Sequence, residues 1–438
     1  MGTPRSVHQG DSTLLENFVR LHPLIRERFP QLERDGSGNP RIHLNCGAGT
    51  LMVDTALEAA AQAGRMLNSL PGEVAPAELA TRDFHIRVRE VTADFLQARD
   101  AREISFHVSS TGALFNLAFA LGRRLDRRMN IIVTDLDHMA NVSPWESVLG
   151  EQTGCPVRRC GLDDQGRIHS GTLLDLCDKR TGLVALTTAS NGLGTVPPVK
   201  ELIAAVRQKS PRALVCVDAV HHALHGPIDV QDLDCDFLVF SGYKVFGPMI
   251  GVLWGRGELL AELKPYRAET NRNVAPYKFE QGTLNNAALA GLLAALEYIA
   301  WLGGRLSSER TRPGSNLRDL FRLAMTAVSA YDRSLTEAVL KGFQELDGNK
   351  FRCYGIVDPK QSAERDPTFA LEVKGLDAEG LKKKLWAGYA LQVADGNHYS
   401  AAVVRHLGRP SIGRVSFCHY HTHRDVEKFI GALKDLAS

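Results

Sequence analysis

Short apolar runs alternate with amphipathic helical segments between about residue 41 and residue 300. The runs are rich in Val, Ile and Leu without polar alternation, which is typical of parallel strands covered by helices on both faces. They are NIIVTD (130–135), LVALTTAS (183–190), ALVCVD (213–218), DFLVFS (236–241) and GVLWG (251–255). Helical patterns at 112–125 and 199–209 lie between them. The alternation predicts an α/β domain with a mostly parallel sheet.

The pattern changes on both sides of this region. The first 40 residues are polar and broken by Gly and Pro, with one helical stretch at 14–29. Beyond about residue 305 helices and strands mix, with helices at 316–331, 378–389 and 425–436 and strands at 368–373 and 413–418. We therefore predict three parts: an N-terminal arm (1–40), a large α/β domain (41–304) and a smaller C-terminal α+β domain (305–438).

Composition narrows the class of protein. The 438 residues are 44% hydrophobic and 23% charged, with a net charge of +2, so neither nucleic acid nor an acidic membrane is an expected partner. No apolar run reaches the ~20 residues of a membrane-spanning helix, and MGTPRSVHQGDS has no apolar core typical of a secretory signal. The eight cysteines lack CxxC spacing, which argues against a zinc site and against a disulfide framework. A cytoplasmic protein is expected.

Polar side chains follow two neighbouring strand runs. Asp218 ends ALVCVD, and Lys244 follows DFLVFS. Ligands of open α/β sheets bind at the carboxyl ends of strands. A carboxylate there can keep a pyridinium nitrogen protonated, and a lysine can form an imine with an aldehyde cofactor. Taken singly, Asp218 is equally well explained as a helix cap, and a lone lysine as a solvated surface residue.

Three further positions suit the same cofactor chemistry. Ser110, Thr111 and Gly112 precede the apolar helix ALFNLAFAL, so they could bind a phosphate at its N-terminus or only cap the helix. His138 follows NIIVTD and could stack on an aromatic ring, or it could be an ordinary loop residue. Asn191 follows LVALTTAS and could donate to a phenolic oxygen or make a turn.

Five blocks in the same order resemble class V aminotransferases, in particular the cysteine desulfurase-like group that uses pyridoxal phosphate. They are DHMANVSPW (137–145), SNGLGTVPPVKEL (190–202), VDAVHHALHGPIDVQDLDCDFLVFSGYKVFGPMIGVLWG (217–255), FEQGTLNNAALAGL (279–292) and GRVSF (413–417). Five ordered blocks over about residues 40–435 are far more specific than a single motif. The resemblance implies the fold type I architecture of pyridoxal-phosphate transferases.

The resemblance also implies roles for individual residues. Lys244 would be the Schiff-base lysine, Asp218 would pair with the pyridine nitrogen, and His138 would stack on the ring. Asn191 and His221 would approach the phenolic oxygen.

The remaining implied roles concern the phosphate, the subunit interface and the substrate. Thr111, Ser241 and Tyr243 would bind the phosphate. Thr283 would reach the phosphate of a neighbouring subunit, so a homodimer with its active site at the interface is expected. Arg414 would hold the carboxylate of an amino acid substrate, a task that suits a guanidinium.

The loop ahead of Arg414 departs from the desulfurase pattern. In one branch of the group this loop carries the nucleophilic cysteine. This chain has DGNHYS (395–400) in the loop, with Tyr399 at the cysteine position beside His398. Both are expected to line the substrate pocket. Cys418 lies four residues beyond Arg414, too far for a simple swing. The chain resembles a desulfurase-like subgroup that lacks the nucleophile.

A C–S lyase best fits these expectations, namely β-elimination on cysteine or an S-substituted cysteine. Lys244, once released by the substrate amine, is suited to take the Cα proton. The alternatives are an aminotransferase or an epimerase of the same superfamily, and a non-catalytic scaffold protein that binds pyridoxal phosphate.

Overall fold

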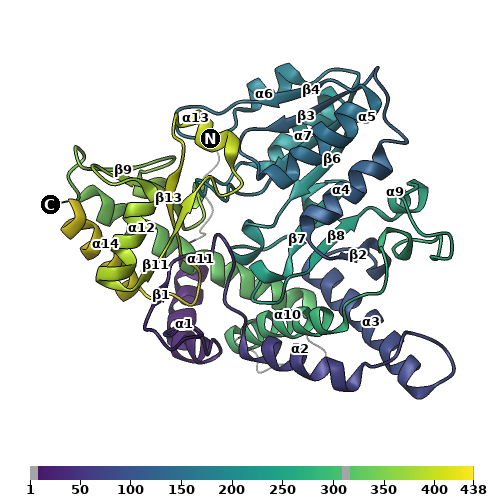
Figure 1. Ribbon diagram of the computed structural model, residues 1–438, viewed down its shortest axis with the longest axis horizontal. Coiled ribbons are helices and arrows are strands. Elements are labelled where there is room, and N and C mark those ends of the chain that lie inside the picture. The colour runs from purple at the N-terminus through teal and green to yellow at the C-terminus, as the bar shows by residue number, and fades with distance from the viewer. Residues whose placement is uncertain (1–7, 308–315, 438) are drawn as a thin grey trace.

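Two larger β-sheets and one two-stranded sheet, with helices packed around them, make up the computed structural model, which describes residues 8–307 and 316–437 (Figure 1). The first residues of the expected N-terminal arm lie outside this description. The larger sheet has seven strands in the order β2-β8-β7-β6-β5-β3-β4. Strands β3 to β7 are mutually parallel, and β8 runs antiparallel to both of its neighbours, β2 and β7. The expected α/β fold with a mostly parallel sheet is confirmed.

Five of the seven strands of this sheet coincide with the predicted apolar runs to within a few residues, whereas β2 and β4 were not predicted. They are β2 (Ile104–His107), β3 (Asn130–Thr134), β4 (Val157–Cys160), β5 (Thr181–Thr187), β6 (Leu214–Asp218), β7 (Phe237–Ser241) and β8 (Gly251–Gly255). In β6, Val215 and Val217 join one apolar core while Leu214 and Cys216 join the other. Side chains alternate between the faces of a strand, so a run that is apolar at every position fills two cores at once.

Helices cover both faces of the sheet and supply the rest of the two cores (Figure 1). The helices before the second sheet are α1 (His8–Glu27), α2 (Asp54–Met66), α3 (Pro76–Phe95), α4 (Ser110–Leu121), α5 (Glu151–Thr153), α6 (Ser170–Leu176), α7 (Val199–Lys209), α8 (Val230–Leu233), α9 (Gly257–Glu262) and α10 (Asn286–Leu306). A π-helical segment (Pro144–Gly150) precedes α5. α7 has the predicted bounds, and α4 begins at Ser110, two residues before its predicted start.

α10 is the one described helix whose length and composition would allow it to cross a membrane. Its apolar sequence is not an uninterrupted run of about 20 residues, because Glu297 and Arg305 interrupt it. Two thirds of its apolar window is buried, and it packs against α2 and α11 (Leu317–Gln344). Burial on several sides explains the composition, because a helix surrounded by protein needs no polar face.

The smaller sheet is antiparallel and has the order β12-β13-β10-β9. Its strands are β9 (Phe351–Cys353), β10 (Thr368–Val373), β12 (Ala394–Gly396) and β13 (Ile412–Ser416). The accompanying helices are α11, α12 (Ala378–Tyr389), α13 (Ala401–His406) and α14 (His423–Ala437). α12 and β10 have the predicted bounds, whereas α11 extends thirteen residues past its predicted end at residue 331.

A short parallel pair ties the N-terminal region to this second sheet. β1 (Ile42–His43) pairs with β11 (Leu391–Gln392), and Asn45 bridges to Ser416. The loop after β1 is thereby held between the two sheets. The residue limits of the three expected parts remain a prediction.

Candidate active site

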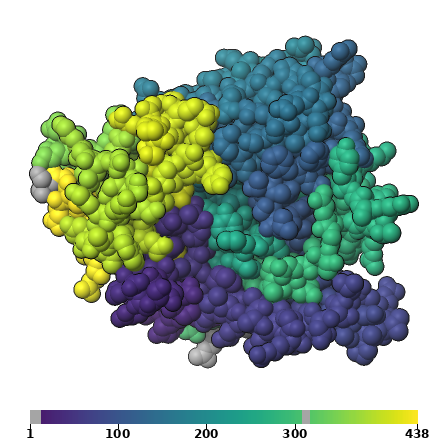
Figure 2. Space-filling model, in the orientation of Figure 1, coloured from purple at the N-terminus to yellow at the C-terminus, as the bar shows by residue number. Residues whose placement is uncertain are grey.

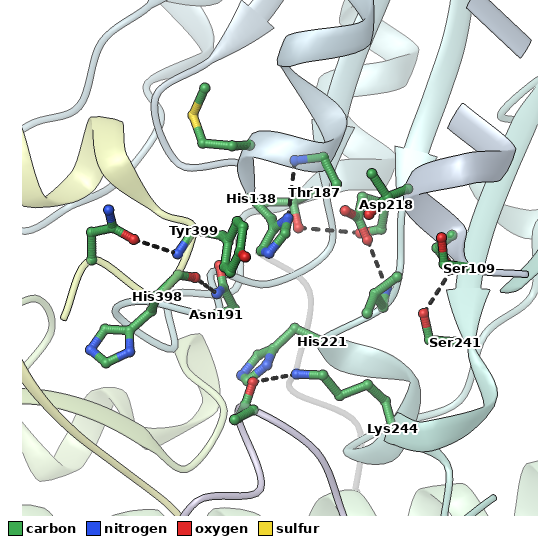
Figure 3. A pocket seen from close by; sticks show the side chains of 18 of the residues that line it. Ser109, His138, Thr187, Asn191, Asp218, His221, Ser241, Lys244, His398 and Tyr399 are labelled. Carbon is green, nitrogen blue, oxygen red and sulfur yellow. Dashed lines mark hydrogen bonds between the residues drawn. The ribbon is translucent and has the colours of Figure 1, made fainter. Parts of the chain in front are cut away.

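A cavity of about 950 Å³ opens at the carboxyl ends of β5, β6 and β7, where parallel strands of an open sheet place their ligands. Strand β12, the loop that follows it (397–399) and Arg414 close it from the second sheet. In Figure 2 the yellow-green C-terminal part and the blue-to-teal part of the chain meet across a hollow in the surface. Figure 3 shows the side chains that face this space. Both sheets therefore contribute to one site.

Lys244 is buried at the base of the cavity, only 3% exposed (Figure 3). It lies in the 3₁₀ turn Gly242–Lys244 directly after β7, and its Nζ donates a hydrogen bond to the carbonyl of Gly47. Burial, followed by the positive charge of Arg414, lowers the pKa of its amine to about 7. A substantial fraction of the amine is therefore neutral, and nucleophilic, near neutral pH.

Asp218 ends β6 and faces the same cavity, 3% exposed. Its Oδ1 accepts a hydrogen bond of 2.8 Å from the backbone N–H of Val220. Burial raises the pKa of this carboxyl to about 6, while the Val220 N–H and the charge of Lys244 act in the opposite direction. The carboxylate is thus a buried negative charge available to a cationic group in the cavity.

The N-terminus of α4 forms another wall of the cavity. Ser109 caps the helix by accepting a hydrogen bond of 3.0 Å from the N–H of Gly112. Ser110 Oγ and Ser241 Oγ lie 2.8 Å apart, and both residues line the cavity together with Thr111. Hydroxyl groups beside free N–H groups at a helix N-terminus form an anion-binding site.

His138 and Tyr399 stack across the mouth of the cavity, with ring centroids 5.4 Å apart and planes at 21°. The Nδ1 of His138 accepts a hydrogen bond of 3.0 Å from the N–H of Ala140. The loop is held from below by buried Asp137, which accepts hydrogen bonds from Thr134 and Asn141. Burial lowers the pKa of His138 to about 4, so its ring is neutral at neutral pH.

Asn191 joins the loop after β5 to the loop from the second sheet. Its Nδ2 donates to the carbonyl of His398 at 2.7 Å, and its Oδ1 accepts from Ser400 Oγ at 2.5 Å. His398 and Tyr399 both have positive φ values, of 53° and 56°. Residues other than Gly and Asn rarely adopt this conformation, so the hydrogen bonds of Asn191 help to hold an unfavourable backbone.

Arg414 crosses from β13 into the cavity and is 2% exposed. Its Nη1 donates to the carbonyl of Asn191 at 3.0 Å, and its Nη2 donates to Asn45 Oδ1 at 3.3 Å. Its Nε has no partner among the described residues. Burial lowers the pKa of Arg414 to about 10, and the group remains a cation at neutral pH. Such a guanidinium can bind a carboxylate.

The cavity brings together most of the residues that the sequence singled out. Those lining it are Ser110, Thr111, His138, Asn191, Asp218, His221, Ser241, Tyr243, Lys244, His398, Tyr399 and Arg414. Gly112 and Thr283 are not among the lining residues, and Thr283 is exposed. Within the single chain Thr283 is therefore apart from the site, and its expected contact with a neighbouring subunit remains a prediction.

Sequence reasoning missed two parts of the lining. Gly47 and Ala48, which follow β1, form one wall of the cavity. The run LNCGAGT that contains them follows a strand, as the other loops of the site do, and this position was the available signal. A Cβ on Gly47 would lie 3.1 Å from Arg414 Cζ, so a glycine allows this close approach. Thr187 and Ser143 also line the cavity. The placement of Thr187 at the end of β5 was the available signal.

Comparison with known proteins identifies relatives of the whole chain. The family model "Aminotransferase class-V" matches residues 43–312 and 314–429. A cysteine desulfurase from Pectobacterium atrosepticum is 30% identical over 432 residues, covering 94% of this chain and 96% of that protein. A cysteine desulfurase from Serratia proteamaculans is also 30% identical, with 94% and 97% covered.

Solved structures agree with the sequence matches. The cysteine desulfurase CsdA from Escherichia coli superposes with a TM-score of 0.78 at 27% identity, over 95% of this chain and 98% of that one. A cysteine desulfurase from Thermococcus onnurineus gives a TM-score of 0.81 at 25% identity, with the same coverage. The similarity therefore extends over both sheets.

Proposed function

The chain belongs to the class V aminotransferase family, whose members depend on pyridoxal phosphate, and we propose that it is a C–S lyase acting on cysteine or an S-substituted cysteine. The observation that carries this proposal is Lys244, a buried amine with a pKa lowered to about 7. It shares one cavity with a buried carboxylate, Asp218, and a buried guanidinium, Arg414.

The cavity fits pyridoxal phosphate on its own chemistry. Its volume of about 950 Å³ accommodates a phosphorylated pyridine together with a small amino acid. Ser110, Thr111 and Ser241 would hold the phosphate, and Asp218 would pair with the pyridine nitrogen. His138 would stack on the ring.

The other polar groups suit the remaining parts of the cofactor and its substrate. Buried Nδ1 of His221 and Nε of Arg414 have no partner among the described residues, so both have unused hydrogen-bonding capacity. His221 and Asn191 would approach the phenolic oxygen, for which Asn191 Nδ2 must leave the carbonyl of His398. Tyr243 would complete the phosphate site.

When bound, pyridoxal phosphate supplies an electron sink for the pair of electrons left at Cα after proton removal. Lys244 would accept the Cα proton at Nζ, because its lowered pKa of about 7 leaves much of the amine neutral near neutral pH. Asp218 would pair with the pyridine nitrogen and keep it protonated. Arg414 orients the substrate through its carboxylate, and the thiolate departs from Cβ. The released unsaturated amino acid hydrolyses to pyruvate and ammonia.

The positions of the cysteines support elimination over persulfide formation. None of the eight cysteines, all within the described residues, lines the cavity. Cys46 is adjacent to Gly47, and its Sγ contacts Cys418 Sγ at 3.4 Å and Tyr420 Oη at 3.2 Å. Tyr399 occupies the loop position where a mobile thiol would be needed, and lines the pocket instead.

A test measures the products from cysteine and from S-methylcysteine with purified protein and added pyridoxal phosphate. We expect pyruvate in equal amount to the thiol released, and no activity in Lys244→Ala. The matched control is a set of single alanine variants of Cys46, Cys353 and Cys418, which should retain pyruvate formation. Alanine formed with a protein-bound persulfide would contradict the proposal.

Other products would support the alternatives. Conversion of the cofactor to its amine form would indicate an aminotransferase, and exchange of the Cα configuration an epimerase. A protein that binds the cofactor but turns over none of these amino acids would support the scaffold alternative. Size-exclusion chromatography with light scattering tests the proposed homodimer, and Thr283→Ala should weaken cofactor binding only in a dimer.

A further inference from the structure

Residues 364–368, which lead into β10 of the second sheet, lie against the loops after β5 and β6 that carry the side chains for the phenolic oxygen. The N–H of Asp366 donates to the carbonyl of Gly194, in the loop after β5, at 2.8 Å. In the turn after β6, the carboxylate of Asp366 lies 3.0 Å from Nδ1 of His222. The second sheet therefore holds both loops, although neither belongs to it.

Thr368, the first residue of β10, adds a side-chain contact to this docking. It is fully buried, and its Oγ1 lies 3.1 Å from Nε2 of His221. His221 is 3% exposed and lines the cavity (Figure 3). Its Nδ1 has no hydrogen-bond partner within residues 8–307 and 316–437. Because Thr368 occupies Nε2, Nδ1 is the nitrogen that remains for a ligand.

The imidazole of His221 is neutral and therefore carries one hydrogen. Burial, followed by the positive charge of Lys244, lowers the pKa of His221 well below its usual value. The carboxylate of Asp366 pairs with His222, so the partner of His221 at Nε2 is a neutral hydroxyl. A neutral imidazole donates from one nitrogen and accepts at the other, so the group bonded to Nε2 decides what Nδ1 can do.

We propose that Thr368 is a positioning residue whose hydroxyl donates to Nε2 of His221, which places the imidazole hydrogen on Nδ1, directed to the phenolic oxygen of pyridoxal phosphate. This inference rests on the proposed function, in which His221 approaches that oxygen. A phenolic oxygen that has lost its proton accepts hydrogen bonds, so the nitrogen facing it has to be the donor. A hydroxyl at position 368 permits this, whereas a carboxylate or a carbonyl there would hold the hydrogen on Nε2.

A hydrogen bond from Nδ1 stabilises the deprotonated form of the phenolic oxygen, because a hydrogen bond to the charged form of a group favours that form. Loss of the donor therefore raises the pH at which the bound cofactor loses its proton. For one charge-assisted hydrogen bond the rise is about one pH unit. The charged groups around His221 stay the same when Thr368 is replaced. They are Lys244, Arg414, and His222 and His225 with their partners Asp366 and Asp332.

The first test measures the visible absorption of full-length protein holding pyridoxal phosphate as a function of pH. We expect Thr368→Val to raise the midpoint by about one pH unit, and Thr368→Ser, which keeps the hydroxyl, to leave it near the wild-type value. Thr92→Val is the matched control, since Thr92 is also fully buried but donates to the carbonyl of Val88 within α3. Thermal melting checks that each variant is folded. An unchanged midpoint in folded Thr368→Val would overturn the proposal.

A second readout locates the hydrogen directly. Long-range ¹H–¹⁵N spectra of the same protein, labelled with ¹⁵N at histidine, distinguish the two neutral tautomers, and His221→Gln assigns the His221 signals. We expect the hydrogen on Nδ1 in the wild type and in Thr368→Ser, and a redistribution toward Nε2 in Thr368→Val. A wild-type His221 with its hydrogen on Nε2 would refute the proposal.

Neither readout requires turnover, so the two proposals fail separately. A midpoint shift in a protein that forms no pyruvate would support the role of Thr368 and contradict the lyase. Pyruvate formation with no midpoint shift in Thr368→Val would do the reverse. A wild type that binds no pyridoxal phosphate would overturn both.

Discussion

Replacing Arg414 by lysine tests the substrate-binding half of the site most directly. The guanidinium is 2% exposed, and its Nη1 and Nη2 already donate to Asn191 and Asn45 on two different loops. With a pKa of about 10 it stays charged throughout the neutral range. Lysine at this position keeps the charge but can offer a carboxylate only a single-point contact.

The expected loss follows from the number of hydrogen bonds. A charge-assisted hydrogen bond contributes about 1.5–3 kcal/mol, and a bidentate contact contains two of them. Arg414→Lys should lose about one, which at 1.36 kcal/mol per factor of ten lowers kcat/KM roughly 10- to 150-fold. Arg414→Met loses both hydrogen bonds and the charge, so kcat/KM should fall by roughly 10² to 10⁴.

The assay is pyruvate release from S-methylcysteine at saturating pyridoxal phosphate, with kcat and KM measured separately. Arg409→Lys is the matched control, since Arg409 precedes the same strand but pairs at the surface with Glu372 at 2.8 Å. Its kcat/KM should stay within about twofold, because exposed ion pairs contribute little.

A substrate without a carboxylate separates recognition from general damage. S-Methylcysteamine should be a very poor ligand of the wild type, and Arg414→Lys should discriminate far less between it and S-methylcysteine. If the folded Arg414→Lys variant keeps both its kcat/KM and its preference for the carboxylate, then Arg414 does not bind the substrate and the reasoning fails.

Four other changes have distinct expected results. Because burial lowers the pKa of Lys244 to about 7, its amine gains a proton as the pH falls through 7. The rate of cofactor attachment, measured by visible absorption from pH 5.5 to 8.5, should therefore decline about tenfold per pH unit below 7. A flat profile would contradict this pKa. Asp218→Asn should retain cofactor but lower kcat about 100-fold or more, because a buried cation loses its counter-charge; an unchanged kcat would exclude the proposed pairing. Tyr399→Phe should change kcat less than about threefold since the stack on His138 persists, whereas a large loss would make the hydroxyl an acid. Arg365→Met should lower the free energy of unfolding by about 3 kcal/mol in urea titrations, because Arg365 donates to the buried carbonyls of residues 193, 356 and 368, and an unchanged midpoint would refute this.

The sequence by itself determined five of the seven strands of the large sheet and the residues at their ends. A parallel strand buried on both faces must be apolar at each position, so β6 and β7 are legible as local patterns. Because Asp218 and Lys244 directly follow these strands, the topology of an α/β sheet brings them to one edge. The ordered blocks then indicated the family, which the family match confirms, and through the family the expected cofactor.

Tertiary structure decided what local patterns do not encode. α10 is apolar because neighbouring helices surround it, which composition alone does not distinguish from a membrane helix. The close approach of Gly47 to Arg414 joins positions 367 residues apart in the chain. The contact between Thr368 and His221 likewise depends on how the second sheet docks. Side-chain periodicity records which face is buried, whereas contacts between distant segments arise only when the elements pack, so their partners are fixed by the fold as a whole.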